Sequence, residues 1–228
     1  MLKFRKAKNI ENILVFTTET DIHTNNEKVR RLANQWHFVH GLYWINELAF
    51  YPQIDERIIG AKYHGAWLEK PIMPGPLLEY LEKQEAVLMV HCGRYKEANI
   101  MSNTSYQHPL RVAQVYPRLK VIMAHMGGTD TAVCKRAIHD STDYDNVYFD
   151  TSGITTPYII EYALARISPT RVLFGSDAPW CSFDAMVATV KDAHISDYDR
   201  NLILYENFNQ LLCESQPKQS REKLPSAA

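Results

Sequence analysis

The sequence lacks any strong excess of charge. Its 228 residues include 25 Lys and Arg and 26 Asp and Glu, which gives a formal net charge of −1. No basic run alternates with aromatic residues, as is common in proteins that bind nucleic acids or anionic membranes. The composition therefore predicts a small-molecule partner, with no nucleic acid and no membrane as partners.

Closely spaced cysteines are also missing. The four cysteines form no C-x-x-C motif, which argues against a structural zinc knuckle and against a disulfide scaffold. They are Cys92, Cys134, Cys181 and Cys213. We expect reduced thiols and hence a cytoplasmic protein.

Long apolar runs are absent from the start of the chain. The basic residues near the N-terminus are followed by an apolar run at residues 13–16 only. This run is too short for the apolar part of a signal peptide or for a membrane span. Nothing in this region predicts export.

What the sequence does contain is a series of short apolar runs rich in β-branched residues. They are apolar throughout instead of alternating, as expected for strands of a parallel sheet that is buried on both faces. Seven such strands are predicted, at residues 12–17, 39–45, 58–64, 86–91, 120–125, 146–151 and 171–176.

Segments with helical spacing and helix-start signals separate most of these strands. We expect helices at residues 25–36, 74–84, 108–116, 129–138, 156–167, 182–193 and 199–212; after the second strand there is only the brief segment 53–57. Repeated strand–helix units predict an α/β fold, specifically a TIM-type (β/α)8 barrel in a single domain at 1–213, with a disordered polar tail at 214–228. An open, doubly wound sheet of seven strands is the alternative.

Seven strands are one fewer than a closed barrel requires. Residues 1–10 resemble the last turns of a helix that leads into the first visible strand. We therefore expect a barrel truncated at its N-terminus, which lacks a preceding strand. The unpaired edges of such a barrel would expose backbone and apolar surface, so the chain could associate with copies of itself as a homo-oligomer.

Histidine and aspartate stand where three predicted strands end. His91 and His125 end consecutive strands, and Asp177 follows the last one. The loops after parallel strands converge on one face of the fold. Two imidazoles and a carboxylate there could hold a divalent metal, with Zn²⁺ the simplest choice and Mn²⁺ an alternative. Asp177 would be a metal ligand, the catalytic acid or base, or both.

A set of ordered motifs resembles the amidohydrolase superfamily, in particular its amidohydrolase-related branch of metal-dependent hydrolases and nonoxidative decarboxylases. The motifs are GAKYHG, VHCGRY, VIMAHMGG, VYFDTSG, RVLFGSDAPW and ILYENFNQLL. The resemblance extends from about residue 1 to 213. It implies a TIM barrel in which His91 and His125 bind metal and Asp177 binds it or transfers a proton.

The sequence departs from that family in one respect. Members open with an H-x-H pair of metal ligands on the first strand, and this chain contains no H-x-H. The nearest imitation, at residues 20–24, includes His23 but aligns better with a loop after the family's second strand. The three candidate ligands would then form only part of a larger metal site.

Four further residues are candidates for substrate binding. Lys62 and His64 end a strand and could contact a substrate, or could lie at the barrel rim for structural reasons. Arg94 could pair with a substrate carboxylate, or could cap a loop carbonyl. Trp180 could form an apolar wall. At residues 150–152 a structural role is favoured over pocket lining.

The main functional hypothesis is a metal-dependent hydrolase that acts on a small carboxylate-bearing or cyclic substrate through a metal-activated water. A nonoxidative decarboxylase of the same fold is an alternative. A catalytically impaired barrel that acts as a binding or interaction protein is another, and so is a metal-free reaction that uses Asp177 and Arg94.

Overall fold

Seven parallel strands form the centre of the molecule. The structure is a computed structural model that describes residues 2–18, 21–46, 52–93 and 103–215. The strands are β1 (Ile13–Val15), β2 (Val39–Trp44), β3 (Ile58–Tyr63), β4 (Val87–Val90), β5 (Lys120–Met123), β6 (Val147–Asp150) and β7 (Val172–Leu173). All seven predicted strands are confirmed.

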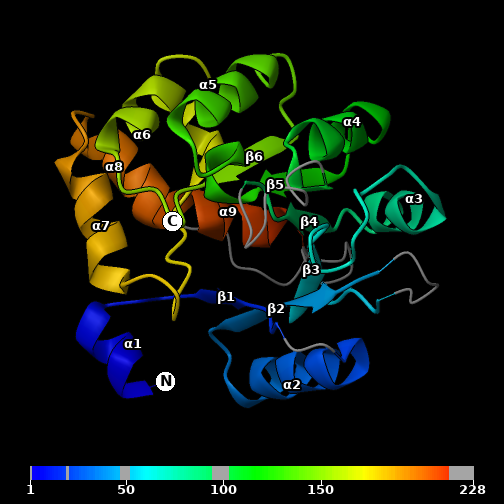
Figure 1. Cartoon of the computed structure of the whole chain (residues 1–228). Coiled ribbons are helices and arrows are strands. Elements are labelled where there is room, and N and C mark those ends of the chain that lie inside the picture. Colours follow the sequence, from blue (N-terminus) through cyan, green and yellow to red (C-terminus); the bar gives the residue numbers. More distant parts are fainter. Residues whose placement is uncertain (1, 19–20, 47–51, 94–102, 216–228) are drawn as a thin grey trace.

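The strands lie in the sheet in the same order as in the sequence, and every neighbouring pair is parallel. The sheet curls into a partial barrel, with β1 and β7 as its two edges (Figure 1). Among the described residues no strand pairs β1 with β7. The predicted seven-strand version of the barrel is therefore confirmed.

Helices surround this sheet. The α-helices are α1 (Leu2–Lys8), α2 (Ile22–Gln35), α3 (Pro76–Lys83), α4 (Gln107–Val115), α5 (Thr131–Asp140), α6 (Pro157–Leu164), α7 (Phe183–Asp192), α8 (Asp197–Asn201) and α9 (Asn207–Glu214), with a π-helical turn at Leu202–Glu206. No helix in the described part of the chain is long and apolar enough to cross a membrane. The predicted tail beyond residue 215 lies outside the described residues.

Local signals explain where several helices begin. Asp21 accepts hydrogen bonds from the backbone N–H groups of His23 and Thr24 at the start of α2, and Asp130 caps α5 in the same way. Such side chains satisfy N–H groups that have no partner inside the helix. His23 is thereby placed in the first turn of α2, where its exposed ring pairs with Glu27.

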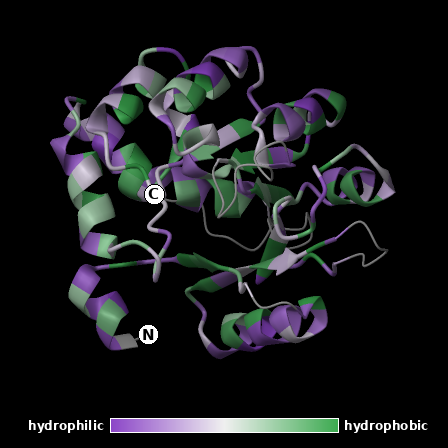
Figure 2. Cartoon of the chain, viewed as in Figure 1, coloured by the Kyte–Doolittle hydropathy of each residue, from purple (hydrophilic) through white to green (hydrophobic). Residues whose placement is uncertain are grey.

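The two largest apolar clusters lie on opposite faces of the sheet. The larger lies between the sheet and the helices on its outer side, and includes Phe149 and Leu119, both 0% exposed. The smaller lies inside the curl, where Leu211 and Leu212 of α9 pack against the inner face of the strands. Figure 2 shows the hydrophobic strands at the centre and the polar faces of the helices outside. Helix α9 thus fills the curl from within.

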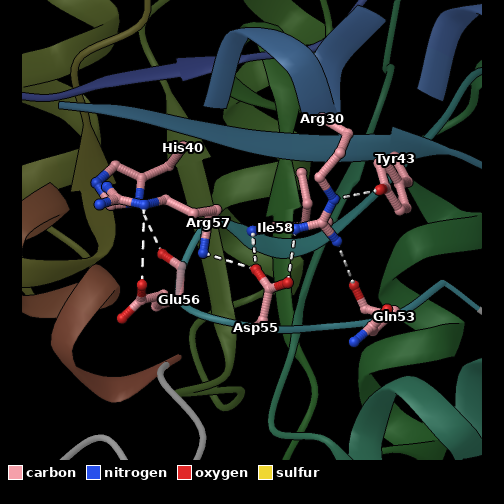
Figure 3. A network of polar contacts seen from close by, with 8 residues as sticks. All are labelled: Arg30, His40, Tyr43, Gln53, Asp55, Glu56, Arg57 and Ile58. Atoms are coloured by element: carbon pink, nitrogen blue, oxygen red, sulfur yellow. Dashed lines mark hydrogen bonds and ion pairs between the residues drawn. The ribbon is translucent and has the colours of Figure 1, made fainter. Parts of the chain in front are cut away.

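The connection between β2 and β3 has no helix in its described part, in line with the weak segment at 53–57. It is fastened by Asp55, whose Oδ1 accepts from the backbone N–H groups of Arg57 and Ile58 at 2.8 and 2.9 Å. Its Oδ2 accepts from Arg30 of α2 at 2.6 Å, and Arg30 also donates to the hydroxyl of Tyr43 (Figure 3). One carboxylate therefore joins a loop, a helix and the start of β3.

We expect Asp55→Ala to lower the free energy of unfolding by about 2 kcal/mol, because two backbone N–H groups and a guanidinium lose their acceptor. Burial alone would raise the pKa of Asp55, but the hydrogen bonds from Ile58, Arg57 and Arg30 lower it overall. A lowered pKa in the folded state stabilises the protein above the unfolded pKa of about 3.9. The difference in unfolding free energy between wild type and variant should therefore be largest at neutral pH and become smaller as the pH falls below the unfolded pKa.

Urea unfolding at several pH values measures this difference. Asp143→Ala, which removes an exposed carboxylate in the turn after α5, is the matched control. Equal losses of stability in both variants would show that Asp55 has no special role.

Candidate functional site

The carboxyl ends of the strands open into a cavity of about 1960 Å³. Six of the seven predicted site residues line it, namely Lys62, His64, His91, His125, Asp177 and Trp180. The seventh, Arg94, lies outside the described residues. Parallel strands thus bring together side chains that are up to 118 positions apart in the sequence, as Trp180 and Lys62 are.

The two candidate metal-binding histidines meet in this cavity. His91 follows β4 and His125 follows β5, and Nδ1 of His91 lies 3.1 Å from Nε2 of His125. Their rings are 4.8 Å apart between centroids and nearly perpendicular, at 74°. Burial, together with the neighbouring His64 and His125, lowers the pKa of His91 far below its ordinary value. A neutral imidazole of this kind is the form that binds a metal.

His125 has an unusual backbone. It lies in the left-handed region with φ 57° and ψ 41°, and the next residue, Met126, does so too. Each such non-glycine residue costs about 1–2 kcal/mol. The surrounding structure holds His125 in place, since its N–H donates to Asp150 at 3.1 Å and its Nδ1 lies 2.9 Å from both the carbonyl oxygen and the hydroxyl of Ser152.

His64 forms a wall behind His91. Their rings stack with 3.9 Å between centroids and an interplanar angle of 11°. The ring of Trp44 also stacks with that of His64, with 6.0 Å between centroids. Burial, with a further contribution from the charge of Lys62, lowers the pKa of His64 to about 3. His64 is therefore a neutral aromatic surface that supports His91.

Lys62 supplies a cationic group within the cavity. Its side chain is 3% exposed, and Nζ lies 4.8 Å from the ring centroid of Phe16. Burial lowers the pKa of Lys62 to about 8, although the charges of Asp150 and Asp177 act in the opposite direction. Contact between Lys62 and a substrate remains a prediction.

Asp177 lies beyond β7 with φ 52°, immediately before a cis Ala178–Pro179 bond. Burial raises its pKa, and the charge of His125 opposes that rise. Nevertheless, within the part of the chain that the structure describes, no three His, Cys, Asp or Glu side chains are arranged to hold one metal ion. The structure therefore brings the two imidazoles together, while Asp177 shares their cavity without joining them as a third ligand.

Two other residues near the site have distinct positions. Trp180 is 65% exposed at the margin of the cavity, where an apolar wall remains a prediction. Cys92, next to His91, points into the outer core, with Sγ 3.7 Å from the carbonyl oxygen of Val90. Burial raises the pKa of its thiol, so the cavity gains no nucleophile from it.

Sequence reasoning missed several residues of the cavity. Phe16 and Trp67 line it, and their sequence positions carried no signal beyond apolar character. Asp150 and Ser152 are 4% and 5% exposed and contact His125 directly. Their place at the end of β6 was the available signal, but a structural role was favoured there.

The donor groups fit a divalent transition metal in part. Two nitrogens bound to one tetrahedral Zn²⁺ at 2.0–2.1 Å would lie about 3.3 Å apart, and the two ring nitrogens here are 3.1 Å apart. A shift of a few tenths of an ångström would place both at ligand distance. The pair fits such an ion as two ligands, and Asp177 is one of the carboxylates that line the same cavity.

Comparisons with known proteins agree with this architecture. The solved structure of an uncharacterised TIM-barrel protein from Bordetella bronchiseptica shares 17% identity with a TM-score of 0.73, over 94% of this chain and 82% of that one. A dihydroxybenzoic acid decarboxylase from Polaromonas sp. JS666, with bound manganese and 2-nitroresorcinol, shares 17% identity with a TM-score of 0.66, over 92% and 84%. An amidohydrolase from Burkholderia multivorans with bound zinc shares 13% identity with a TM-score of 0.69, over 92% and 86%.

At these identities the solved structures show the fold, a TIM-type barrel. No curated protein matches the chain in sequence. The family model described as amidohydrolase, however, matches residues 55–211, which is more than half of the chain and includes both histidines and Asp177. The chain belongs to the amidohydrolase family.

Proposed function

We propose that the chain is a metal-dependent hydrolase that acts on a small carboxylate-bearing or cyclic substrate. The observation that carries the proposal is the pair of ring nitrogens of His91 and His125, 3.1 Å apart in a cavity at the strand ends. The two imidazoles would hold Zn²⁺ or Mn²⁺, with Asp177 as a further ligand or as proton acceptor. A bound divalent metal lowers the pKa of a coordinated water to about 7 and polarises a carbonyl group.

The residues around the pair have separate tasks in this proposal. The ammonium of Lys62 binds the substrate carboxylate from within the cavity. His64 supports His91 through ring stacking, and Trp180 borders the opening. Burial raises the pKa of Asp177, which favours a carboxylate that accepts a proton during the reaction.

The test begins with the metal. The purified chain is incubated with Zn²⁺ or Mn²⁺, passed through a desalting column and analysed for metal content. The proposal predicts about one ion per chain, because the two histidines would bind the same ion. A chain that retains neither metal would contradict it.

The loaded chain is then offered lactones, esters and amides that carry a carboxylate, and dihydroxybenzoates like those named for the structural neighbours. Release of acid reports hydrolysis, and release of CO₂ reports decarboxylation, the alternative within the same fold. Saturable binding without turnover of any compound would favour the impaired barrel that acts as a binding protein.

Asp177→Asn should lower kcat for any compound that is turned over by about 10²–10⁴-fold, because the amide cannot accept the proton. The unfolding midpoint should change little, since Asp177 lies in a loop that borders the cavity. Steady-state kinetics measure the effect, with Asp143→Asn as an exposed control. Unchanged kcat in Asp177→Asn would exclude the catalytic role.

A further inference from the structure

One buried carboxylate oxygen organises the surroundings of His125. Oδ1 of Asp150 accepts from the backbone N–H of His125 at 3.1 Å, from the backbone N–H of Ser152 at 2.9 Å, and from the hydroxyl of Ser152. The Asp150 side chain is buried at the end of β6, and Ser152 is buried with it. These bonds fix both the left-handed backbone of His125 and the position of Ser152.

The same bonds determine which nitrogen of His125 carries the proton. Nδ1 lies 2.9 Å from the carbonyl oxygen of Ser152, which can only accept. It also lies 2.9 Å from the Ser152 hydroxyl oxygen, whose single proton is directed to Asp150. Both partners of Nδ1 are therefore acceptors, and Nδ1 must be the donor. In the neutral ring Nε2 then carries the lone pair, and Nε2 is the atom that faces His91.

We propose that Asp150 and Ser152 are positioning residues that hold His125 in its Nδ1-protonated tautomer and so present Nε2 as the electron-pair donor of the site. The use of that lone pair, as a metal ligand, rests on the proposed function; the tautomer itself does not.

The packing around these residues leaves little room for another arrangement. A Cβ added to Gly175, beyond β7, would lie 3.0 Å from Cβ of Ser152 and 3.1 Å from Oδ1 of Asp150. A Cβ on Gly153, which has φ 67°, would lie 3.3 Å from Nδ1 of His125. Two glycines thus permit the close approach of the backbone on which the arrangement depends.

The experiment reads the tautomer directly. The metal-free chain is labelled with ¹⁵N-histidine, and long-range ¹H–¹⁵N NMR spectra of the imidazoles are recorded near neutral pH. The His125 signals are assigned by their loss in His125→Ala. The proposal predicts protonated Nδ1 and unprotonated Nε2. The opposite tautomer in the wild type would overturn it.

Variants then test the two positioning residues. Asp150→Asn should give a mixture of the two tautomers and weaken Zn²⁺ binding by about 10–100-fold, the range typical for residues that orient a ligand. Ser152→Ala should weaken Zn²⁺ binding toward the lower end of that range, because the contact between Nδ1 of His125 and the carbonyl oxygen of residue 152 remains. Ser152→Thr, which keeps the hydroxyl, should retain the wild-type affinity. Zn²⁺ affinity is measured by competition with a chromophoric chelator.

Thr151→Val is the matched control. Thr151 lies between the two residues, and its hydroxyl accepts from the N–H of Gly175 at 3.1 Å instead of contacting His125. The proposal predicts an unchanged His125 tautomer in this variant. If Thr151→Val changes the tautomer as much as Asp150→Asn does, or if Asp150→Asn changes nothing, the positioning role is refuted. The expected tautomer without Zn²⁺ binding to the wild type would refute the proposed function and leave this inference standing.

Discussion

A chain in which His91 and His125 are both replaced by alanine should bind no Zn²⁺ above background. Each imidazole supplies one of the two nitrogens that lie 3.1 Å apart, and the described residues contain no group of three His, Cys, Asp or Glu side chains that could hold a metal ion instead. Loss of a residue that only orients a ligand weakens metal binding by about 10–100-fold. Each single replacement removes a ligand itself and should therefore weaken Zn²⁺ binding by more than that. Competition with a chromophoric chelator measures all three affinities.

The control for this experiment is His139→Ala. His139 lies on α5, its side chain is 74% exposed, and it pairs with Asp140. Its loss should leave Zn²⁺ affinity unchanged, which separates the cavity from adventitious binding at surface histidines. Circular dichroism shows whether each variant remains folded. Tight Zn²⁺ binding that persists in the folded double variant would place the metal elsewhere and refute the assignment.

Replacement of Gly60 with alanine should destabilise the protein by about 3 kcal/mol or more, because the new methyl group meets a neighbouring strand. A Cβ at this position would lie 1.8 Å from the carbonyl oxygen of Val87 in β4, and its next contacts are also backbone atoms of Val87. Backbone atoms cannot move aside as the end of a flexible side chain can. Gly60 and Val87 face each other in the register of β3 and β4.

Urea unfolding followed by circular dichroism measures this loss as a lower midpoint. Gly75→Ala is the matched control, since a Cβ there meets no atom within 4 Å and the backbone is extended with φ −177°. The free energy of unfolding of Gly75→Ala should stay within about 1 kcal/mol of the wild-type value, because alanine weakens the helix cap but also makes the unfolded chain less flexible, and the two effects offset each other. Equal midpoints for Gly60→Ala and the wild type would show that the two strands can separate without cost.

Much of the fold could be predicted from apolar runs and helix signals. Each predicted strand is present, because a run of β-branched residues buried on both faces has few other stable structures. The boundaries differ by a few residues; α2 begins at Ile22 instead of residue 25, because Asp21 provides the helix cap. The last predicted helix is divided in the structure into α8, a π-helical turn and α9, a detail that periodicity alone does not reveal.

The candidate site was predictable to a lesser degree. The strand-end positions of His91, His125, Lys62 and Asp177 indicated one shared face, and all four line one cavity. The assembly of His91, His125 and Asp177 as three ligands of one ion remains a prediction, because within the described ranges the two imidazoles meet without a third ligand. The stacking of His64 on His91 was not predictable, since it depends on the distance and angle between rings on neighbouring strands.

The sequence by itself determined the repeated strand–helix pattern, the parallel order of the strands and the face on which polar strand ends collect. These depend on local periodicity and on the geometry common to all parallel sheets. Only the tertiary structure decided that Asp150 and Ser152 hold His125, and that Nε2 of His125 faces His91. Hydrogen bonds between residues 25 or more positions apart depend on atomic distances, and those are set by how the strands and loops pack together.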